Sequence, residues 1–428
     1  MRLVLGKINI KGVEFAPVTK VDNGILMVNQ EELASLIKED SRIANVAIFL
    51  AKPGDSTRII PVKDVIEPRV KVEGPGNVFP GFLGKVDMVG SGRTHVLKGA
   101  AVVTTGKIVG FQEGIIDMTG PGAEYTPFSQ TYNVVIKAEP VPGLSQHEHE
   151  SILRIAGFKA AAYLGEAGRN ISADEEEIFD VPSIAEALRK YPGLPKVAYV
   201  YMLQTQGLLH DTYVYGVDAK RILPTFISPT EVMDGAVVSG NCVSACDKNP
   251  TYIHQNNPVI RELFRRHGQD YNFIATIITN ENVTLADKER SSSYTAKLAE
   301  MIGIDAAIIT EEGFGNPDAD LVMNCRKLEQ KGIKTVLITD EYAGRDGSSQ
   351  SLADTTPEAA AVVTGGNANE TIVLPKLATV IGHQEVADTI AGGFSGSLRS
   401  DGSIEVEIQA LTGATSEVGF TKLGVNGF

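Results

Sequence analysis

The sequence has few cysteines, an excess of acidic residues and no long apolar run, and each shortage excludes a class of protein. Three cysteines among 428 residues are too few, and odd in number, for a disulfide framework, so they favour a reducing cytoplasm. The formal net charge of -14 argues against a nucleic-acid partner, because phosphate binding needs clustered lysine and arginine. An acidic run at Asp174–Glu177 is expected to be a solvated patch. No apolar run reaches membrane-spanning length and no signal-peptide pattern is present, so we expect no membrane association.

The first part of the chain has the pattern of a β-rich domain. Short apolar runs alternate with glycine and proline clusters such as Gly120–Pro121–Gly122. This spacing predicts a barrel-like or sandwich-like domain over residues 1–140, with one helix near Gln30–Ile37. Turns explain the glycine clusters, and neither of the glycine motifs that bind nucleotide phosphates is found.

Residues 141–241 predict an α/β connecting region. Ser145 and Glu148 have the form of a capping box, which predicts the start of a helix ahead of an apolar stripe. A further helix is expected over residues 183–190 and a strand over Lys196–Leu203.

Residues 242–428 change to an alternation of strands and helices. This alternation predicts a parallel-sheet, Rossmann-like α/β domain, in which ligands bind at the carboxyl ends of the strands. The expected elements are Tyr271–Ile278, Ala286–Ile302, Ala306–Thr310, Asp318–Gln330 and Thr335–Thr339.

The carboxyl ends of these strands carry acidic and amide side chains. The stretches are Thr279–Asn282, Glu311–Asn316 and Asp340–Tyr342. Taken singly, they are explained by helix caps and loop solvation. Taken together, they would form a rim unsuited to phosphate but able to hold an ammonium group or a partner, and both interpretations stay open.

A short segment near the middle of the chain holds two of the three cysteines. In it Gly240 and Asn241 precede Cys242, and Cys246 follows. The Cys242 thiol can attack the Asn241 carbonyl through a five-membered ring and replace the peptide bond with a thioester. β-Elimination would then leave dehydroalanine, and hydrolysis of its imine form would give a pyruvoyl group. Gly240 favours this chemistry because glycine tolerates a strained backbone.

Residue chemistry alone leaves other interpretations of this segment open. The Asn241 amide can cyclise onto its own carbonyl and release Cys242. Cys242 and Cys246 can instead form a redox pair, or Cys242 can stay intact in a non-catalytic α/β ligand-binding protein. A structural zinc site is not expected, because Cys325 has no CxxC partner and fits the core of a helix.

Resemblance to a known family favours cleavage. The stretch VVSGNCVSACDKNPTYIHQNNP, residues 237–258, resembles the processing region of the protein B proproteins of clostridial glycine, sarcosine and betaine reductases. The likeness runs from the opening MRLVLGKINIKGVEFAP to the closing ALTGATSEVGFTKLGVNGF. It implies cleavage between Asn241 and Cys242, giving two subunits of which the second begins with a pyruvoyl group derived from Cys242. We expect no metal or nucleotide cofactor.

The resemblance also implies an oxidoreductase and its partners. The pyruvoyl ketone would bind glycine as a Schiff base for reductive deamination toward acetyl phosphate and ammonia. The implied partners are the selenoprotein subunit of protein B, selenoprotein A and protein C, which forms acetyl phosphate. Sarcosine and betaine stay open as substrates. The two cleavage products are expected to stay associated, because the stretch Phe226–Val238 before the cut is largely apolar.

Processing needs a proton acceptor and groups that stabilise the reacting bond. His254, twelve residues after Cys242, is the candidate base, because imidazole titrates near neutral pH. Asp247 could orient a base, and Lys248 could stabilise an oxyanion or a substrate carboxylate. Cys246 is an alternative precursor on chemical grounds alone, whereas the resemblance selects Cys242.

Overall fold

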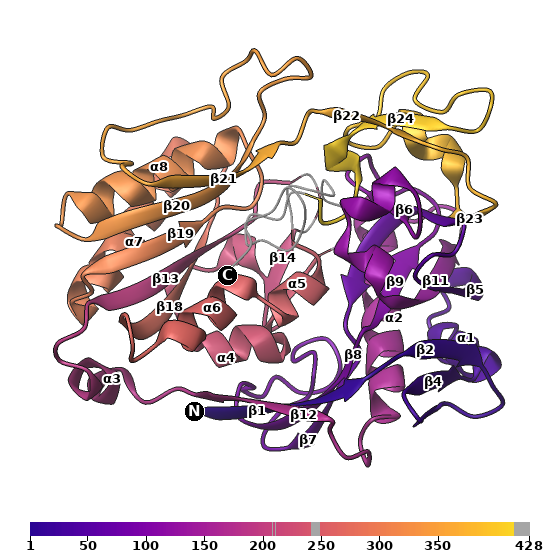
Figure 1. Cartoon of the computed structure of the whole chain (residues 1–428), viewed down its shortest axis with the longest axis horizontal. Coiled ribbons are helices and arrows are strands. Elements are labelled where there is room, and N and C mark those ends of the chain that lie inside the picture. Colours follow the sequence, from indigo (N-terminus) through magenta and orange to yellow (C-terminus); the bar gives the residue numbers. More distant parts are fainter. Residues whose placement is uncertain (208, 210, 241–248, 415–428) are drawn as a thin grey trace.

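The structure is a computed structural model that describes residues 1–207, 209, 211–240 and 249–414. It has the predicted mixed α/β class. Figure 1 shows two large sheets on opposite sides of the molecule, one built from strands early in the chain and the other with helices α7 and α8 packed beside it. Within the described ranges, no helix combines the length and the apolar character needed to cross a bilayer.

The first large sheet has the order β10-β6-β9-β11-β5, and β23 joins it beside β6 from far along the chain. All ten residues of β6 are buried, so this strand lies inside the molecule rather than at its surface. The strands are β5 (Ile43–Ala51), β6 (Thr57–Ile66), β9 (Ala100–Thr105), β10 (Gly114–Asp117), β11 (Tyr132–Pro140) and β23 (Thr379–Gly382).

Two smaller sheets and a helix complete the β-rich part. One sheet has the order β12-β1-β8-β7 and the other β2-β4-β3. Their strands are β1 (Arg2–Asn9), β2 (Gly12–Phe15), β3 (Lys20–Asp22), β4 (Ile25–Val28), β7 (Arg69–Glu73), β8 (Gly92–Lys98) and β12 (Glu175–Asp180), and the helix is α1 (Gln30–Ile37). The bounds of α1 are those predicted. Most of the acidic run forms strand β12 and pairs with β1, and Asp174–Glu176 are exposed, as expected of a solvated patch.

Helix α2 (Gln146–Glu166) packs across the β-rich part. Ser145 and Glu148 form the predicted capping box at its start. The helix lies so close to β7 that a Cβ atom at Gly165 would sit 2.1 Å from the carbonyl oxygen of Arg69. Only glycine permits this approach, which anchors α2 against the strand.

The second large sheet has the order β16-β18-β13-β19-β20-β21 and is parallel except for β16. Its elements are β13 (Lys196–Leu203), β16 (Thr225–Ile227), β18 (Asn272–Asn280), β19 (Ala306–Thr310), β20 (Lys334–Glu341) and β21 (Val362–Asn367), with helices α7 (Leu285–Ile302) and α8 (Asn316–Glu329). The strands and helices predicted after residue 270 are confirmed. β13, which precedes the cysteine segment, lies between β18 and β19, which follow it.

Short elements connect these sheets. They are β14 (Thr212–Val214), β15 (Val217–Asp218), β17 (Val237–Ser239), β22 (Thr371–Leu374), β24 (Ile404–Glu407), α3 (Ile184–Lys190), α4 (Pro229–Glu231), α5 (Thr251–Gln255) and α6 (Pro258–Arg266). The predicted helix over residues 183–190 is confirmed as α3. In Figure 1 α5 and α6 lie in the middle of the molecule, between the two large sheets.

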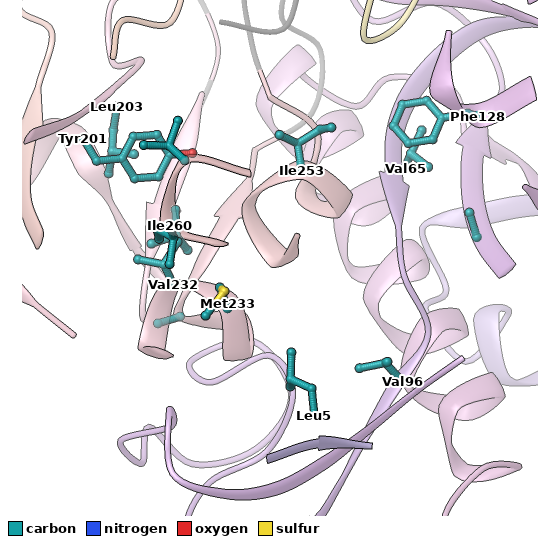
Figure 2. Packing of buried hydrophobic residues seen from close by; sticks show 14 of the residues in the cluster. Leu5, Val65, Val96, Phe128, Tyr201, Leu203, Val232, Met233, Ile253 and Ile260 are labelled. Carbon is teal, nitrogen blue, oxygen red and sulfur yellow. The ribbon is translucent and has the colours of Figure 1, made fainter. Parts of the chain in front are cut away.

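A single apolar core joins the two sides of the molecule. Figure 2 shows part of it, with Val65 and Phe128 on one side and Tyr201 and Leu203 on the other. The core contains Ile227, Val232, Met233 and Val237 from before the cysteine segment and Ile253, Ile260, Leu263 and Ile278 from after it. The packing expected for the stretch Phe226–Val238 is therefore confirmed.

Candidate functional site

Most of the predicted site residues fall within residues 241–248, which lie outside the described part of the chain. They are Asn241, Cys242, Cys246, Asp247 and Lys248. The site is therefore defined by the two residues that flank this stretch, Gly240 and Asn249, which are both buried, and by the groups that contact these flanks.

Thr251 brings the two ends of the cysteine segment together. Its hydroxyl oxygen accepts the main-chain N–H of Ser239 at 3.0 Å and donates to Oδ2 of Asp64 at 2.7 Å. The main-chain N–H of Thr251 donates to Oδ1 of Asp64 at 2.9 Å. Because Asp64 belongs to β6, both ends of the segment are tied to the β-rich part of the molecule.

The Gly240 flank is held by a main-chain bond and by an arginine. The N–H of Gly240 donates to the carbonyl of Asp211 at 2.6 Å. The guanidinium of Arg154, on α2, donates to the carbonyl of Gly240 at 3.0 Å. Arg154 is itself buried, with its guanidinium carbon 4.5 Å from the centre of the Tyr213 ring. This stacking fixes the arginine one residue before the bond predicted to break.

The Asn249 flank is held by a carboxylate. Oε1 of Glu312 accepts the main-chain N–H of Asn249 at 3.2 Å and its side-chain amide at 2.8 Å. Oε2 of the same carboxylate accepts the N–H of Gln204 at 2.9 Å. Glu312 lies just after β19 and Gln204 just after β13, so the carboxyl ends of two neighbouring strands hold this flank.

His254, the predicted base, is a buried residue of helix α5. Its Nδ1 lies 2.6 Å from the hydroxyl of Tyr201, which comes from the centre of the parallel sheet. Its Nε2 lies 3.8 Å from Oε1 of Glu312. A phenol and a carboxylate thus face the two nitrogens of the imidazole, which fixes the plane of the ring.

The acidic stretches at the carboxyl ends of the strands are buried, so the expectation of simple loop solvation is wrong for their central members. Glu281, Glu311 and Glu312 have no exposed surface. Burial, reinforced by the nearby Glu312 carboxylate, raises the pKa of Glu281 well above its usual range. Burial, together with the Asp318 carboxylate, does the same for the pKa of Glu311. Two carboxyl groups with raised pKa values therefore lie close to the carboxylate that holds the Asn249 flank.

No metal cluster accompanies these groups in the described part of the chain. No three histidine, cysteine, aspartate or glutamate side chains there are arranged to hold an ion. A cavity of about 720 Å³ lies between β12 and helices α5 and α6, with Lys7, Tyr252 and Arg261 in its lining. Its described lining includes neither Gly240 nor His254, so it is separate from the flanks. Cys325 is buried in α8, the core position expected for it.

Comparison with known proteins identifies the family of the chain. A sequence model described as glycine/sarcosine/betaine reductase component B subunits matches residues 1–426. The chain belongs to this family. It is 69% identical, over 99% of both chains, to "Glycine reductase complex component B subunits alpha and beta" of Acetoanaerobium sticklandii. It is 63% identical, over the full length of both chains, to the protein of the same description from Peptoclostridium acidaminophilum.

A relative with a different substrate in its name is less similar. The chain is 56% identical, over 99% of both chains, to "Sarcosine reductase complex component B subunit alpha" of Peptoclostridium acidaminophilum. No solved structure matches this member of the component B family.

Three residues that contact the ends of the segment were not predicted to take part in cleavage, and Glu312 was expected only as a member of the acidic stretch Glu311–Asn316. Asp64, Arg154 and Glu312 lie between 63 and 187 positions from the flanking residues they contact. For Glu312 the sequence did carry a signal, because it follows the end of a predicted parallel strand. Asp64 and Arg154 lie within a strand and a helix, where no local pattern distinguishes them.

Proposed function

We propose that the chain is the proprotein of the substrate-binding component of glycine reductase, and that it is cleaved between Asn241 and Cys242. The observation that carries this proposal is membership of the component B family over residues 1–426. Glycine is favoured as the substrate because the identities to two glycine reductase proteins, 69% and 63%, exceed the 56% to a sarcosine reductase protein. The expected partners are the selenoprotein subunit of protein B, selenoprotein A and protein C.

The proposed cleavage needs no external oxidant or reductant. The Cys242 sulfur attacks the Asn241 carbonyl carbon, the C–N bond breaks, and the nitrogen of Cys242 takes up a proton. Loss of the Cα proton and of the sulfur then leaves dehydroalanine and a thiocarboxylate on Asn241. Water adds to the imine form of dehydroalanine and releases ammonia, which leaves a pyruvoyl group. In place, this group would supply an electrophilic ketone for the amine of glycine.

The described residues fit this chemistry. Both residues that flank the cysteine segment, Gly240 and Asn249, are buried. His254 is proposed as the proton acceptor, because Tyr201 and Glu312 orient its ring and its helix begins two residues after Asn249. Arg154 holds the carbonyl next to the bond that breaks.

The two cleavage products are proposed to remain one particle in the cytoplasm. Residues 1–241 would keep β13 between two strands of residues 242–428. The β-rich part and the parallel-sheet part would then act as two domains that enclose the pyruvoyl group. Size-exclusion chromatography of the cleaved protein in physiological buffer should give one peak that separates into two chains only in denaturant.

Mass spectrometry of the full-length chain tests the central proposal. The natural sequence should give two fragments, the second of which reacts with a carbonyl reagent and is trapped on glycine by borohydride. Cys242→Ala should give one chain of about 45.7 kDa without a reactive carbonyl, because alanine has neither the nucleophile nor the leaving group.

Cys246→Ala is the matched control and should be cleaved like the natural chain, because only the residue after the broken bond can become the pyruvoyl group. Cleavage of Cys242→Ala at the same bond would instead assign the reaction to asparagine cyclisation or to a protease. Stronger trapping with sarcosine than with glycine would overturn the assigned substrate.

A further inference from the structure

Glu312 contacts three of the described residues around the cysteine segment, Asn249, Gln204 and His254. One oxygen accepts two N–H groups of Asn249 and the other accepts the N–H of Gln204. The first oxygen also lies 3.8 Å from Nε2 of His254. A single side chain therefore joins the end of the cysteine segment, the centre of the sheet and the proposed base.

The positions of these contacts suggest what the carboxylate does. Asn249 is the first described residue after the segment, so holding its main chain and side chain limits where the segment can go. His254 already faces Tyr201 through Nδ1, so a carboxylate near Nε2 favours one orientation of the ring. Both effects depend on an acceptor with two oxygens, because donors approach it from two sides.

We infer that Glu312 is a positioning residue of the cleavage step. It rests on the proposed function, since it assumes that the chain cleaves itself at Asn241–Cys242. Glu312 anchors Asn249, the first described residue after the segment, and orients the imidazole of His254. Its described contacts assign this role to the interactions with Asn249 and His254.

Glu281 provides a matched control for this inference. It is as fully buried as Glu312 and directly adjacent to it, since its Oε1 accepts the main-chain N–H of Glu312 at 2.8 Å. A glutamine at position 281 still offers an oxygen to that N–H. A glutamine at position 312 places an amide N–H₂ against either the two N–H groups of Asn249 or the N–H of Gln204, which then lose their acceptor.

The first experiment measures the rate of cleavage after synthesis of the full-length chain. Glu312→Gln should be cleaved about 10- to 100-fold more slowly, the effect of losing hydrogen bonds to a charged group. Glu281→Gln should be cleaved within about threefold of the natural rate. Thermal unfolding of each variant in the uncleaved Cys242→Ala background checks that both still fold.

The second experiment asks whether Glu312 acts through Asn249. Asn249→Ala removes the side-chain contact from the other partner, so it should slow cleavage even if Glu312→Gln does not fold. The double variant should be no slower than the slower single variant, because both changes remove the same interaction. Full additivity of the two effects would show that the contact between them has no part in positioning.

The third experiment reads the orientation of His254 directly. In ¹⁵N-histidine-labelled Cys242→Ala protein, the ring signals of His254 should shift in Glu312→Gln and stay in place in Glu281→Gln. A natural cleavage rate together with unmoved His254 signals in Glu312→Gln would overturn the inference and leave the proposed function standing. Cleavage of Cys242→Ala would reject the self-cleavage on which both depend.

Discussion

The two sides of the molecule bury charged groups in opposite ways. In the β-rich part, buried carboxylates lie against buried cations. The pairs are Arg58–Asp117, Lys63–Glu113, Arg69–Glu67 and Lys71–Asp234. At the carboxyl edge of the parallel sheet, Glu281, Glu311 and Glu312 are equally buried, and the ammonium of Lys288 pairs with Asp320 instead.

The difference teaches when a buried carboxyl group keeps its proton. Burial alone would raise the pKa of Glu113, but the ammonium of Lys63 and two main-chain N–H groups hold it below its usual range. In the described part of the chain no cation forms an ion pair with Glu281 or Glu311, and burial raises the pKa of both well above that range, although Lys288 slightly opposes this at Glu281. Asp117 is an intermediate case. Burial outweighs the effect of the paired Arg58 guanidinium, so the pKa of Asp117 is raised. In the β-rich part a nearby ammonium group thus keeps the pKa of the buried Glu113 low, whereas at the sheet edge burial raises the pKa of Glu281 and Glu311.

Breaking a pair on the β-rich side should have the largest effect. Lys63→Met keeps much of the side-chain volume but leaves the buried Glu113 without a cation. We expect a loss of about 3–5 kcal/mol in the free energy of unfolding, the usual result of removing one partner of a buried pair. Urea unfolding in the Cys242→Ala background, where the chain stays in one piece, measures this loss. A loss below about 1 kcal/mol would mean that the ammonium is not what keeps Glu113 ionised.

On the opposite side, replacing a protonated carboxyl group should change the pH dependence of stability. Because the pKa of Glu311 is raised in the folded state, its contribution to stability is complete below the ordinary carboxyl pKa and is lost as pH rises through the folded value. Glu311→Gln resembles the protonated form, so it should remove this loss. The variant should melt close to the natural protein at pH 5 and a few degrees above it at pH 8, by scanning calorimetry in the Cys242→Ala background. A constant difference between the two pH values would show that folding does not raise the pKa of Glu311.

Breaking an exposed ion pair should have the smallest effect on the free energy of unfolding, and this tests the role of burial. Lys98 and Glu175 lie 3.5 Å apart with about half of each side chain exposed. Glu175→Gln should cost less than about 0.5 kcal/mol, because water screens the pair. The same urea unfolding, repeated in high salt, should reduce even this difference. A cost similar to that of Lys63→Met would break the comparison, because pairing and not burial would then decide the effect.

Local patterns in the sequence predicted most elements. The bounds of α1, β13 and β19 agree with the prediction, because each is a short apolar or amphipathic run between clear breaks. The capping box at Ser145 also marked the start of α2 correctly. Strand β12 was missed, because three successive glutamates are poor strand formers. Contacts with Lys7, Arg93 and Lys98 stabilise them there, and such partners cannot be read from a local window.

The candidate site was predictable only in part. The cysteine segment and His254 stand out by residue chemistry, since a thiol beside an asparagine and a nearby imidazole form a recognisable set. Glu312 and Asp64 approach the segment only after the sheets have formed, so their roles depend on pairing between distant strands. The position of β13 between β18 and β19 was likewise beyond local patterns.

The position of β13 between two strands that are synthesised later determines when the site can form. A ribosome makes β13 well before its neighbours β18 and β19, and Glu312 leaves the ribosome after all three. A chain whose synthesis stops near residue 300 has Asn241, Cys242 and His254, yet it lacks β19, one of the two strands that flank β13, and the carboxylate that holds Asn249. If cleavage needs that geometry, unfinished chains stay whole. Cleavage would then take place only in completed chains, so only completed chains would become active enzyme.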